Sequence, residues 1–143
     1  MPAPKTASLL NKAFASEHPL NIIVAEDNKL NQLLILKILD RLGYTPVLAE
    51  NGLEVIALLE QQPYDLILMD LEMPEMDGLA ACRHIRKNGI LQPHIVAMTA
   101  DVIGEKQQEC LDAGMNGFLG KPINLDVLYM ELIKTAETLK EAK

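Results

Sequence analysis

The chain alternates between short apolar runs and longer stretches in which apolar residues recur every three or four positions. Short runs are typical of strands buried on both faces, and the longer periodic stretches are typical of amphipathic helices. Glycines such as Gly43, Gly89 and Gly114 separate these segments. The pattern predicts strands at 21–25, 44–49, 64–70, 94–98 and 117–119, and helices at 28–42, 53–61, 79–88, 104–113 and 124–140.

Five strands in alternation with five helices predict an α/β fold, in which a parallel sheet carries helices on both faces. Right-handed crossovers then restrict the topology. In the first long helix, Leu30, Leu34, Ile38 and Leu42 make one apolar stripe with Leu33 beside it. Such a stripe is the side that a surface helix turns toward the core.

The two ends of the chain do not share this pattern. Residues 1–19 combine Pro, Ala, Ser and Lys without sustained periodicity, which predicts a tail or linker with a short helix at about 8–15. Residues 20–140 are expected to form one domain, followed by a C-terminal tail at 141–143. We expect no output domain in this chain, because almost nothing follows the last helix.

Composition narrows the classes of function. Thirteen Lys and Arg residues against twenty Asp and Glu residues give a net charge of −7, which argues against a nucleic-acid-binding surface. There is no run of 18 apolar residues for a membrane span, and no secretory signal is visible. Cys82 and Cys110 match neither a CxxC pair nor a zinc spacing. We therefore expect two reduced thiols in a cytoplasmic protein that has no membrane contact of its own.

Polar residues stand at the ends of four predicted strands. Glu26 and Asp27 follow the first, Asp70 ends the third, Thr99 follows the fourth and Lys121 follows the fifth. The carboxyl ends of parallel strands share one edge of the sheet, where open α/β folds bind their ligands. Three carboxylates there would repel by roughly 4 kcal/mol per pair at ~4 Å and an effective dielectric of ~20. The site therefore holds a cation or a protonated carboxyl, and oxygen donors without His or Cys favour Mg²⁺.

These residue types fit phosphoryl transfer to the protein itself. An aspartate such as Asp70 can attack phosphorus and form an aspartyl-phosphate. Mg²⁺ and Lys121 would neutralise the phosphoryl oxygens, and Thr99 would donate a hydrogen bond to the phosphoryl group.

The motifs at these positions resemble the receiver domain of two-component response regulators. They are the acidic pair Glu26-Asp27, MDLEMPEMDG around Asp70, MTA at 98–100 and GKPI at 120–123. Each motif is weak alone, but together, in this order and each at a strand end, they are highly specific. AEDNKLNQ at 25–32 and LGY at 42–44 are similar to the receivers of hybrid sensor histidine kinases.

The resemblance implies the ligands of the metal and a fold. Asp70 would be the phosphoacceptor and a metal ligand. Asp27 would bind Mg²⁺ directly, Glu26 would bind it through water, and Glu72 would contribute its backbone carbonyl. The implied fold is flavodoxin-like, with five parallel strands in the order 2-1-3-4-5 and five helices.

The resemblance also implies a switch. Lys121 would pair with Asp70 or the phosphate, and the bond between Lys121 and Pro122 would be cis. Thr99 would move toward the phosphoryl group, with Phe118 swinging inward behind it. Phenylalanine stands here where tyrosine is common in the family, so this part of the switch would act through packing alone.

The implied partner is a histidine kinase or a histidine phosphotransfer domain that donates its phosphoryl group. The receiver would then change the surface of its fourth and fifth strands and helices, and its catalysis would be limited to its own phosphorylation and slow hydrolysis. The hybrid-like motifs favour the receiver of a hybrid histidine kinase. The alternatives are a stand-alone single-domain regulator and a receiver-like interaction module that is never phosphorylated. A flavodoxin-like cofactor carrier or an aspartate-based hydrolase is a further alternative, although no glycine-rich phosphate loop follows the first strand. A homodimer stays open.

Overall fold

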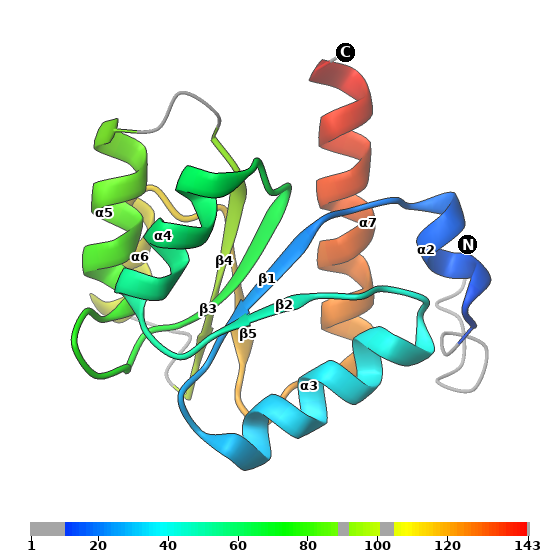
Figure 1. Ribbon diagram of the computed structural model, residues 1–143, viewed down its shortest axis with the longest axis horizontal. Helices are drawn as coiled ribbons and strands as arrows, with labels where there is room; N and C mark the ends of the chain where they lie inside the picture. Colours follow the sequence, from blue (N-terminus) through cyan, green and yellow to red (C-terminus); the bar gives the residue numbers. More distant parts are fainter. Residues whose placement is uncertain (1–10, 89–91, 101–104, 143) are drawn as a thin grey trace.

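The computed structural model describes residues 11–88, 92–100 and 105–142, and a parallel sheet of five strands lies at its centre (Figure 1). The strands are β1 (Ile22–Ala25), β2 (Val47–Ala49), β3 (Leu66–Asp70), β4 (His94–Thr99) and β5 (Gly117–Gly120). Their order is β2-β1-β3-β4-β5, and neighbouring strands run parallel. The strand order implied by the receiver resemblance is confirmed.

The described residues contain six helices, whereas the hydrophobic pattern predicts five. They are α2 (Ala13–Glu17), α3 (Lys29–Arg41), α4 (Gly52–Gln61), α5 (Gly78–Asn88), α6 (Glu105–Ala113) and α7 (Leu125–Ala142). The additional helix, α2, lies within 1–19 and begins later than the short helix expected at 8–15, of which residues 8–10 lie outside the described residues. Gly104, the predicted first residue of the helix observed as α6, also lies outside the described residues.

Helix α2 packs on the domain through one aromatic side chain. Phe14 is only 5% exposed. Its ring centroid lies 4.7 Å from that of Tyr129 on α7 and 6.1 Å from that of Tyr44. The Tyr44 hydroxyl in turn donates a hydrogen bond to the carbonyl of His18 at 2.6 Å. The sequence pattern placed this helix too early because a single buried residue in five gives no period.

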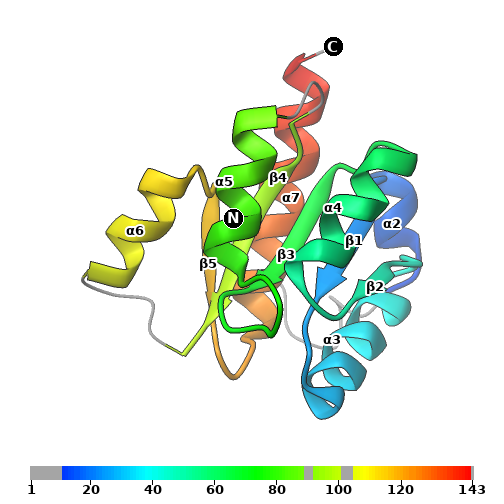
Figure 2. The same ribbon diagram turned by 60° about the vertical axis from the view of Figure 1, so that its left-hand side comes forward.

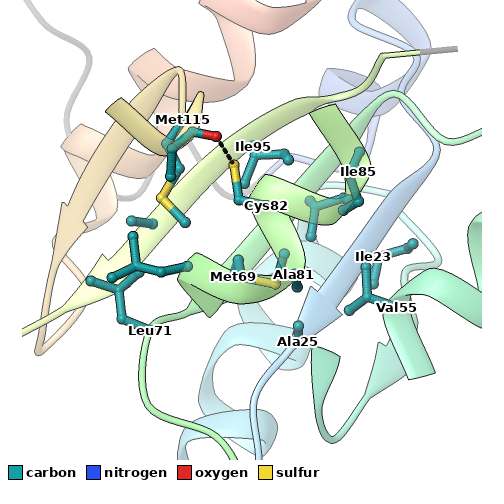
Figure 3. Close-up of a cluster of buried hydrophobic side chains, with 14 of the residues drawn as sticks. Ile23, Ala25, Val55, Met69, Leu71, Ala81, Cys82, Ile85, Ile95 and Met115 are labelled. Carbon is teal, nitrogen blue, oxygen red and sulfur yellow. Dashed lines mark hydrogen bonds between the residues drawn. The ribbon is translucent and has the colours of Figure 1, made fainter. Parts of the chain in front are cut away.

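The strands alternate their side chains between two cores, one on each face of the sheet. In β3, Ile67 and Met69 belong to the first core, and Leu66 and Leu68 belong to the second. Helices α4, α5 and α6 cover the first core, whereas α3 and α7 cover the second (Figures 1 and 2). Figure 3 shows the first core, where α5 lies over the strands.

Helix α3 buries only the second half of the predicted stripe, because Leu42 is buried and Ile38 packs on the second core, whereas the leucines nearer its start are exposed. Leu30 and Leu34 of the predicted stripe are 69% and 51% exposed, and the neighbouring Leu33 is 67% exposed. The buried residues of this helix are Gln32, Ile35 and Leu39, followed by Leu42 at its C-cap. The Gln32 side-chain amide donates a hydrogen bond to the carbonyl of Glu26 at 2.5 Å, which turns the Gln32 face inward. The prediction is wrong for the first two turns, because there a polar residue occupies the buried face and leucines occupy the exposed one.

A hollow of about 550 Å³ lies at the amino ends of the strands. It is lined by the segment that enters β1, by the turn at Gly43 and Tyr44, and by Leu139 and Lys140 near the end of α7. Gly43 has φ +97°, and a Cβ at this position would collide with the carbonyl of Lys12. Only glycine therefore allows the turn to pass so close to α2. Among the described residues, no helix has both the length and the apolar character needed to cross a bilayer.

Candidate phosphoacceptor site

Strand register brings the predicted site residues to one edge of the sheet. Ala25 at the end of β1 pairs with Met69 of β3, so the residues that follow them, Glu26 and Asp70, are neighbours. On the other side, the Lys121 backbone N–H donates to the carbonyl of Thr99 at 2.9 Å. Groups from four segments of the chain thus meet at the carboxyl ends of the strands.

Three carboxylates gather at this edge. Glu26, Asp27 and Asp70 each offer an oxygen atom, and these oxygens all lie within 4.8 Å of one another. Glu26 is 1% exposed and Asp70 is 5% exposed, whereas Asp27 is exposed. Like charges at this distance repel, and the buried pair cannot be screened by solvent as Asp27 is.

Lys121 bridges the two buried carboxylates. Its Nζ lies 3.0 Å from Oε1 of Glu26 and 3.1 Å from Oδ2 of Asp70. Burial alone would lower the pKa of the Lys121 ammonium, but the hydrogen bonds to Glu26 and Asp70 and their charges outweigh burial and raise this pKa. Lys121 is therefore charged at neutral pH. The Lys121–Pro122 peptide bond is cis.

The loop between β3 and α5 closes tightly over Asp70. The Glu72 backbone N–H donates to Oδ1 of Asp70 at 3.1 Å, and the Gly78 N–H donates to the Leu71 carbonyl at 3.2 Å. A Cβ on Gly78 would collide with the Asp70 carbonyl, so only glycine fits there. The Asp77 side chain accepts a hydrogen bond from the N–H of Ala80 at 2.8 Å, in the first turn of α5. The Glu72 side chain is exposed and lines the cleft above Asp70.

The two predicted switch residues lie on β4 and β5. Thr99 ends β4 and is 8% exposed. Phe118 lies on β5, half-buried, and packs against the first core. It pairs in register with Ala97, and Thr99 pairs with Gly120. The two side chains thus come from adjacent strands beside the cleft, and their part in a switch stays a prediction.

Two polar residues that sequence reasoning did not place at the site hold Glu26. The Asn28 backbone N–H donates to Oε2 of Glu26 at 3.1 Å, while the Asn28 side chain caps α3 by accepting from the Asn31 N–H at 3.0 Å. Asn28 was predicted only as that cap. The hydrogen bond from Gln32 to the Glu26 carbonyl had no signal in the sequence, because a glutamine in a helix is ordinarily exposed.

A third residue missed by the sequence is Lys106. An open cleft of about 680 Å³ lies over the carboxylates, and Lys106 lines it together with Asp27, Asp70, Glu72 and Lys121. Lys106 lies in the first turn of α6 and belongs to none of the recognised motifs.

The donor set of the cleft fits a hard divalent cation. The only candidate metal cluster among the described residues is made of carboxylates, and two of its three members are buried. All-oxygen ligation with room for water is the arrangement that suits Mg²⁺. Glu26, Asp27 and Asp70 would hold such an ion, and the Lys121 ammonium lies 3.1 Å from Oδ2 of Asp70.

The fold and the site together define a doubly wound α/β domain with a cation-binding carboxylate cleft at the carboxyl edge of its sheet. Residues 22–133 match the family model of the response regulator receiver domain, and the chain belongs to this family. The resemblance drawn from the four motifs is thus confirmed.

Curated relatives are large histidine kinases. The chain is 43% identical over 137 residues to Histidine protein kinase 1 of Candida albicans, an alignment that covers 88% of this chain and 6% of the relative. It is 32% identical over 133 residues to the sensor histidine kinase RcsC of Escherichia coli K12, covering 93% of this chain and 14% of RcsC. The chain therefore spans only a small part of the length of these relatives.

Solved structures of receivers have the same fold. The receiver domain of sensor histidine kinase PA1611 from Pseudomonas aeruginosa, which has a magnesium ion coordinated in its active site cleft, matches with TM-score 0.75 and 36% identity over 82% of this chain and 98% of that one. The receiver domain of Ssk1 from Saccharomyces cerevisiae, crystallised with the histidine phosphotransfer protein Ypd1, matches with TM-score 0.76 and 28% identity. That match covers 82% of this chain and 88% of the other.

Proposed function

We propose that the chain is the receiver segment of a hybrid histidine kinase, which accepts a phosphoryl group on Asp70 in a Mg²⁺-dependent phosphorelay. One observation carries this proposal. Asp70 lies within 4.8 Å of two further carboxylates and 3.1 Å from the Lys121 ammonium, at the rim of a parallel sheet. Without a cation, the carboxylates of such a cluster repel one another. A cation bound there would also neutralise the oxygens of an incoming phosphoryl group.

In the proposed reaction, a carboxylate oxygen of Asp70 attacks the phosphorus of a phosphohistidine. The new O–P bond forms as the P–N bond breaks, and the imidazole leaves as the neutral base after taking up a proton. Lys121 holds one phosphoryl oxygen by its charge, and the Thr99 hydroxyl donates to another. Glu26 and Asp27, with Asp70 and the backbone carbonyl of Glu72, would hold Mg²⁺. When bound, this ion supplies neutralisation of the phosphoryl charge.

Phosphorylation would be passed on through the face formed by β4, α6, β5 and α7. Lys121 now binds Glu26 and Asp70 at once. A phosphoryl group on Asp70 would compete for this ammonium and would attract the Thr99 hydroxyl. Phe118 lies half-buried on the adjacent strand and would fill the space behind Thr99 through packing.

The donor would be a histidine phosphotransfer domain or a kinase domain that docks beside the cleft. Three exposed leucines of α3, Leu30, Leu33 and Leu34, lie near Asn31, which lines the cleft. Leu34 also borders a small hollow that reaches Lys121. We propose that these leucines contact the donor, as an exposed apolar cluster beside a reaction site marks an interface. The Ssk1 receiver, a structural neighbour, is known in complex with such a phosphotransfer protein.

Labelling by acetyl phosphate tests the proposed function. Intact-mass spectrometry of the full chain should show addition of one phosphoryl group only when Mg²⁺ is present. Asp70→Asn should abolish labelling, whereas Asp40→Asn, an exposed carboxylate at the far end of α3, should label as the wild type does. Labelling that survives in Asp70→Asn would refute the assignment. No labelling of the wild type by acetyl phosphate, phosphoramidate or a phosphorylated phosphotransfer domain would favour the pure interaction module.

The hybrid-kinase origin has its own test. Kinase-coding sequence in frame upstream of Met1 supports it, and an isolated reading frame supports the stand-alone regulator.

The reduced, buried thiols of Cys82 and Cys110 are compatible with the cytoplasmic location that we propose.

A further inference from the structure

Lys106 is a second lysine at the site, and it differs from Lys121 in its surroundings. It is half-buried and lines the same cleft as Asp70. Its helix is fixed, because Cys110, one turn further along α6, is fully buried in the first core. A packed helix therefore fixes the backbone of Lys106 beside the cleft that its side chain lines.

Lys106 has no carboxylate of its own among the residues that the structure describes. Lys121 forms ion pairs with Glu26 and Asp70, and these are the salt bridges found in the described ranges. A lysine that borders a carboxylate-rich cleft without a short ion pair keeps its charge available for an incoming anion.

The negative charges of the other residues that line this cleft give the Lys106 ammonium a function. Exposed carboxylates of Asp27, Glu72 and Asp77 line it, in addition to the buried pair. A phosphodonor that approaches Asp70 carries a dianionic phosphoryl group, and these carboxylates repel it. The charge of Lys121 is already compensated by its ion pairs with Glu26 and Asp70. Lys106 is therefore the uncompensated cation of the described cleft lining.

We propose that Lys106 is a specificity-determining residue that attracts the dianionic phosphoryl group of the donor to the cleft before transfer. This inference rests on the proposed phosphoacceptor function and adds to it a preference for highly charged donors. Lys106 acts on encounter and binding, whereas the groups around Asp70 act on the transfer step. Removing it should raise the donor concentration needed for half-maximal rate and leave the maximal rate nearly unchanged.

The test compares donors of different charge on the full chain with saturating Mg²⁺. With dianionic acetyl phosphate, Lys106→Gln should raise the half-saturating concentration about threefold, and Lys106→Glu should raise it about tenfold. Lys106→Arg should restore the wild-type value. With phosphoramidate, whose ammonium group leaves one net negative charge, the effect should be smaller. At high ionic strength, the effect of each Lys106 substitution on the half-saturating concentration should become smaller for both donors. Lys87→Gln, an exposed lysine at the end of α5, is the matched control.

The failure of this inference and the failure of the proposed function give different results. If the wild type is labelled on Asp70 and Lys106→Gln and Lys106→Glu match it with both donors, the inference is wrong and the phosphoacceptor function stands. A loss of maximal rate with an unchanged half-saturating concentration would also overturn it, because that would place Lys106 in the transfer step. If the wild type takes no phosphoryl group from any donor, both proposals fail. Circular dichroism of each variant checks that the fold is retained.

Discussion

Glu72 lines the cleft, and its backbone and its side chain have different roles. Its backbone N–H donates to Asp70, whereas its side chain is exposed and lines the cleft. A substitution of the side chain therefore leaves the backbone contact in place. Because this side chain lines the cleft that holds Asp70, we expect its charge to repel the hydroxide that would hydrolyse an aspartyl-phosphate.

We expect Glu72→Gln to shorten the lifetime of the phosphorylated protein about two- to fivefold. The measurement is the loss of the phosphoryl group over time after removal of the donor, followed by mass spectrometry. Glu75→Gln is the control, since Glu75 is exposed in the same loop but does not line the cleft. An unchanged or slower rate in Glu72→Gln would count against this role of the carboxylate.

Cys82 provides a prediction about pH. Its thiol is fully buried and donates a hydrogen bond to the Ala113 carbonyl at 3.2 Å (Figure 3). Burial raises the pKa of this thiol from 9.0 to about 11. The unfolded chain then loses this proton at a lower pH than the folded one, so the stability it contributes is present below pH 9.0 and is lost as the pH rises toward about 11. Urea unfolding at pH 8, 9 and 10 should show a steeper loss in the wild type than in Cys82→Ala. Parallel curves would contradict this.

At the scale of elements, α2 shows how much a short helix depends on one contact. Five residues cannot form a stable helix alone. The Phe14 ring, packed on Tyr44 and Tyr129, therefore holds it in place. The Ala15 N–H also donates to the Leu42 carbonyl at 2.9 Å, so the helix is tied to the end of α3.

Phe14→Ala should lower the free energy of unfolding by about 3 kcal/mol, because it empties a buried aromatic site. Chemical denaturation measures this loss. Hydrogen exchange should show faster exchange at Ala15. Glu17→Gln, exposed on the same helix, should leave both unchanged. A wild-type stability for Phe14→Ala would mean that α2 contributes nothing to the fold.

Elements differ in how well the sequence predicts them, and the reason is physical. The strands could be located because a strand buried on both faces must be an apolar run, as in β3. The face of α3 could not, because almost every position from Leu33 to Leu39 is apolar and the polar Gln32 faces inward. The position of α2 could not, because its one buried residue finds its partners far along the chain.

At the scale of the whole molecule, the parallel sheet explains why the site itself was predictable. Any parallel sheet brings Glu26, Asp70 and Lys121 to one edge, and the strand order β2-β1-β3-β4-β5 places them close enough to meet. Side chains that come from helices, such as Lys106, depend on how each helix is rotated and packed. The sequence does not give that rotation, and this is why Lys106 was missed.

A cation in the cleft should stabilise the whole domain, because the chain carries a net charge of −7 and three of its carboxylates meet there. Mg²⁺ at ten times its dissociation constant should add about 1.4 kcal/mol, which corresponds to a rise in Tm of about 3–6 °C. Differential scanning fluorimetry with and without Mg²⁺ measures it. Asp27→Asn should raise the Tm without metal and lose most of the shift, whereas Asp112→Asn should keep it. An undiminished shift in Asp27→Asn would contradict the ligand assignment.

The hollow at the amino ends of the strands has a consequence for attachment. It places the segment that leads into β1 beside the last turns of α7, at the pole of the sheet that carries the amino ends of the strands. Asp70 lies at the opposite pole, roughly one strand length or ~17 Å away. A fluorophore attached at Lys140, which lines this hollow, should therefore leave the approach to Asp70 unobstructed. A phosphodonor tethered there would need a linker long enough to reach around the sheet.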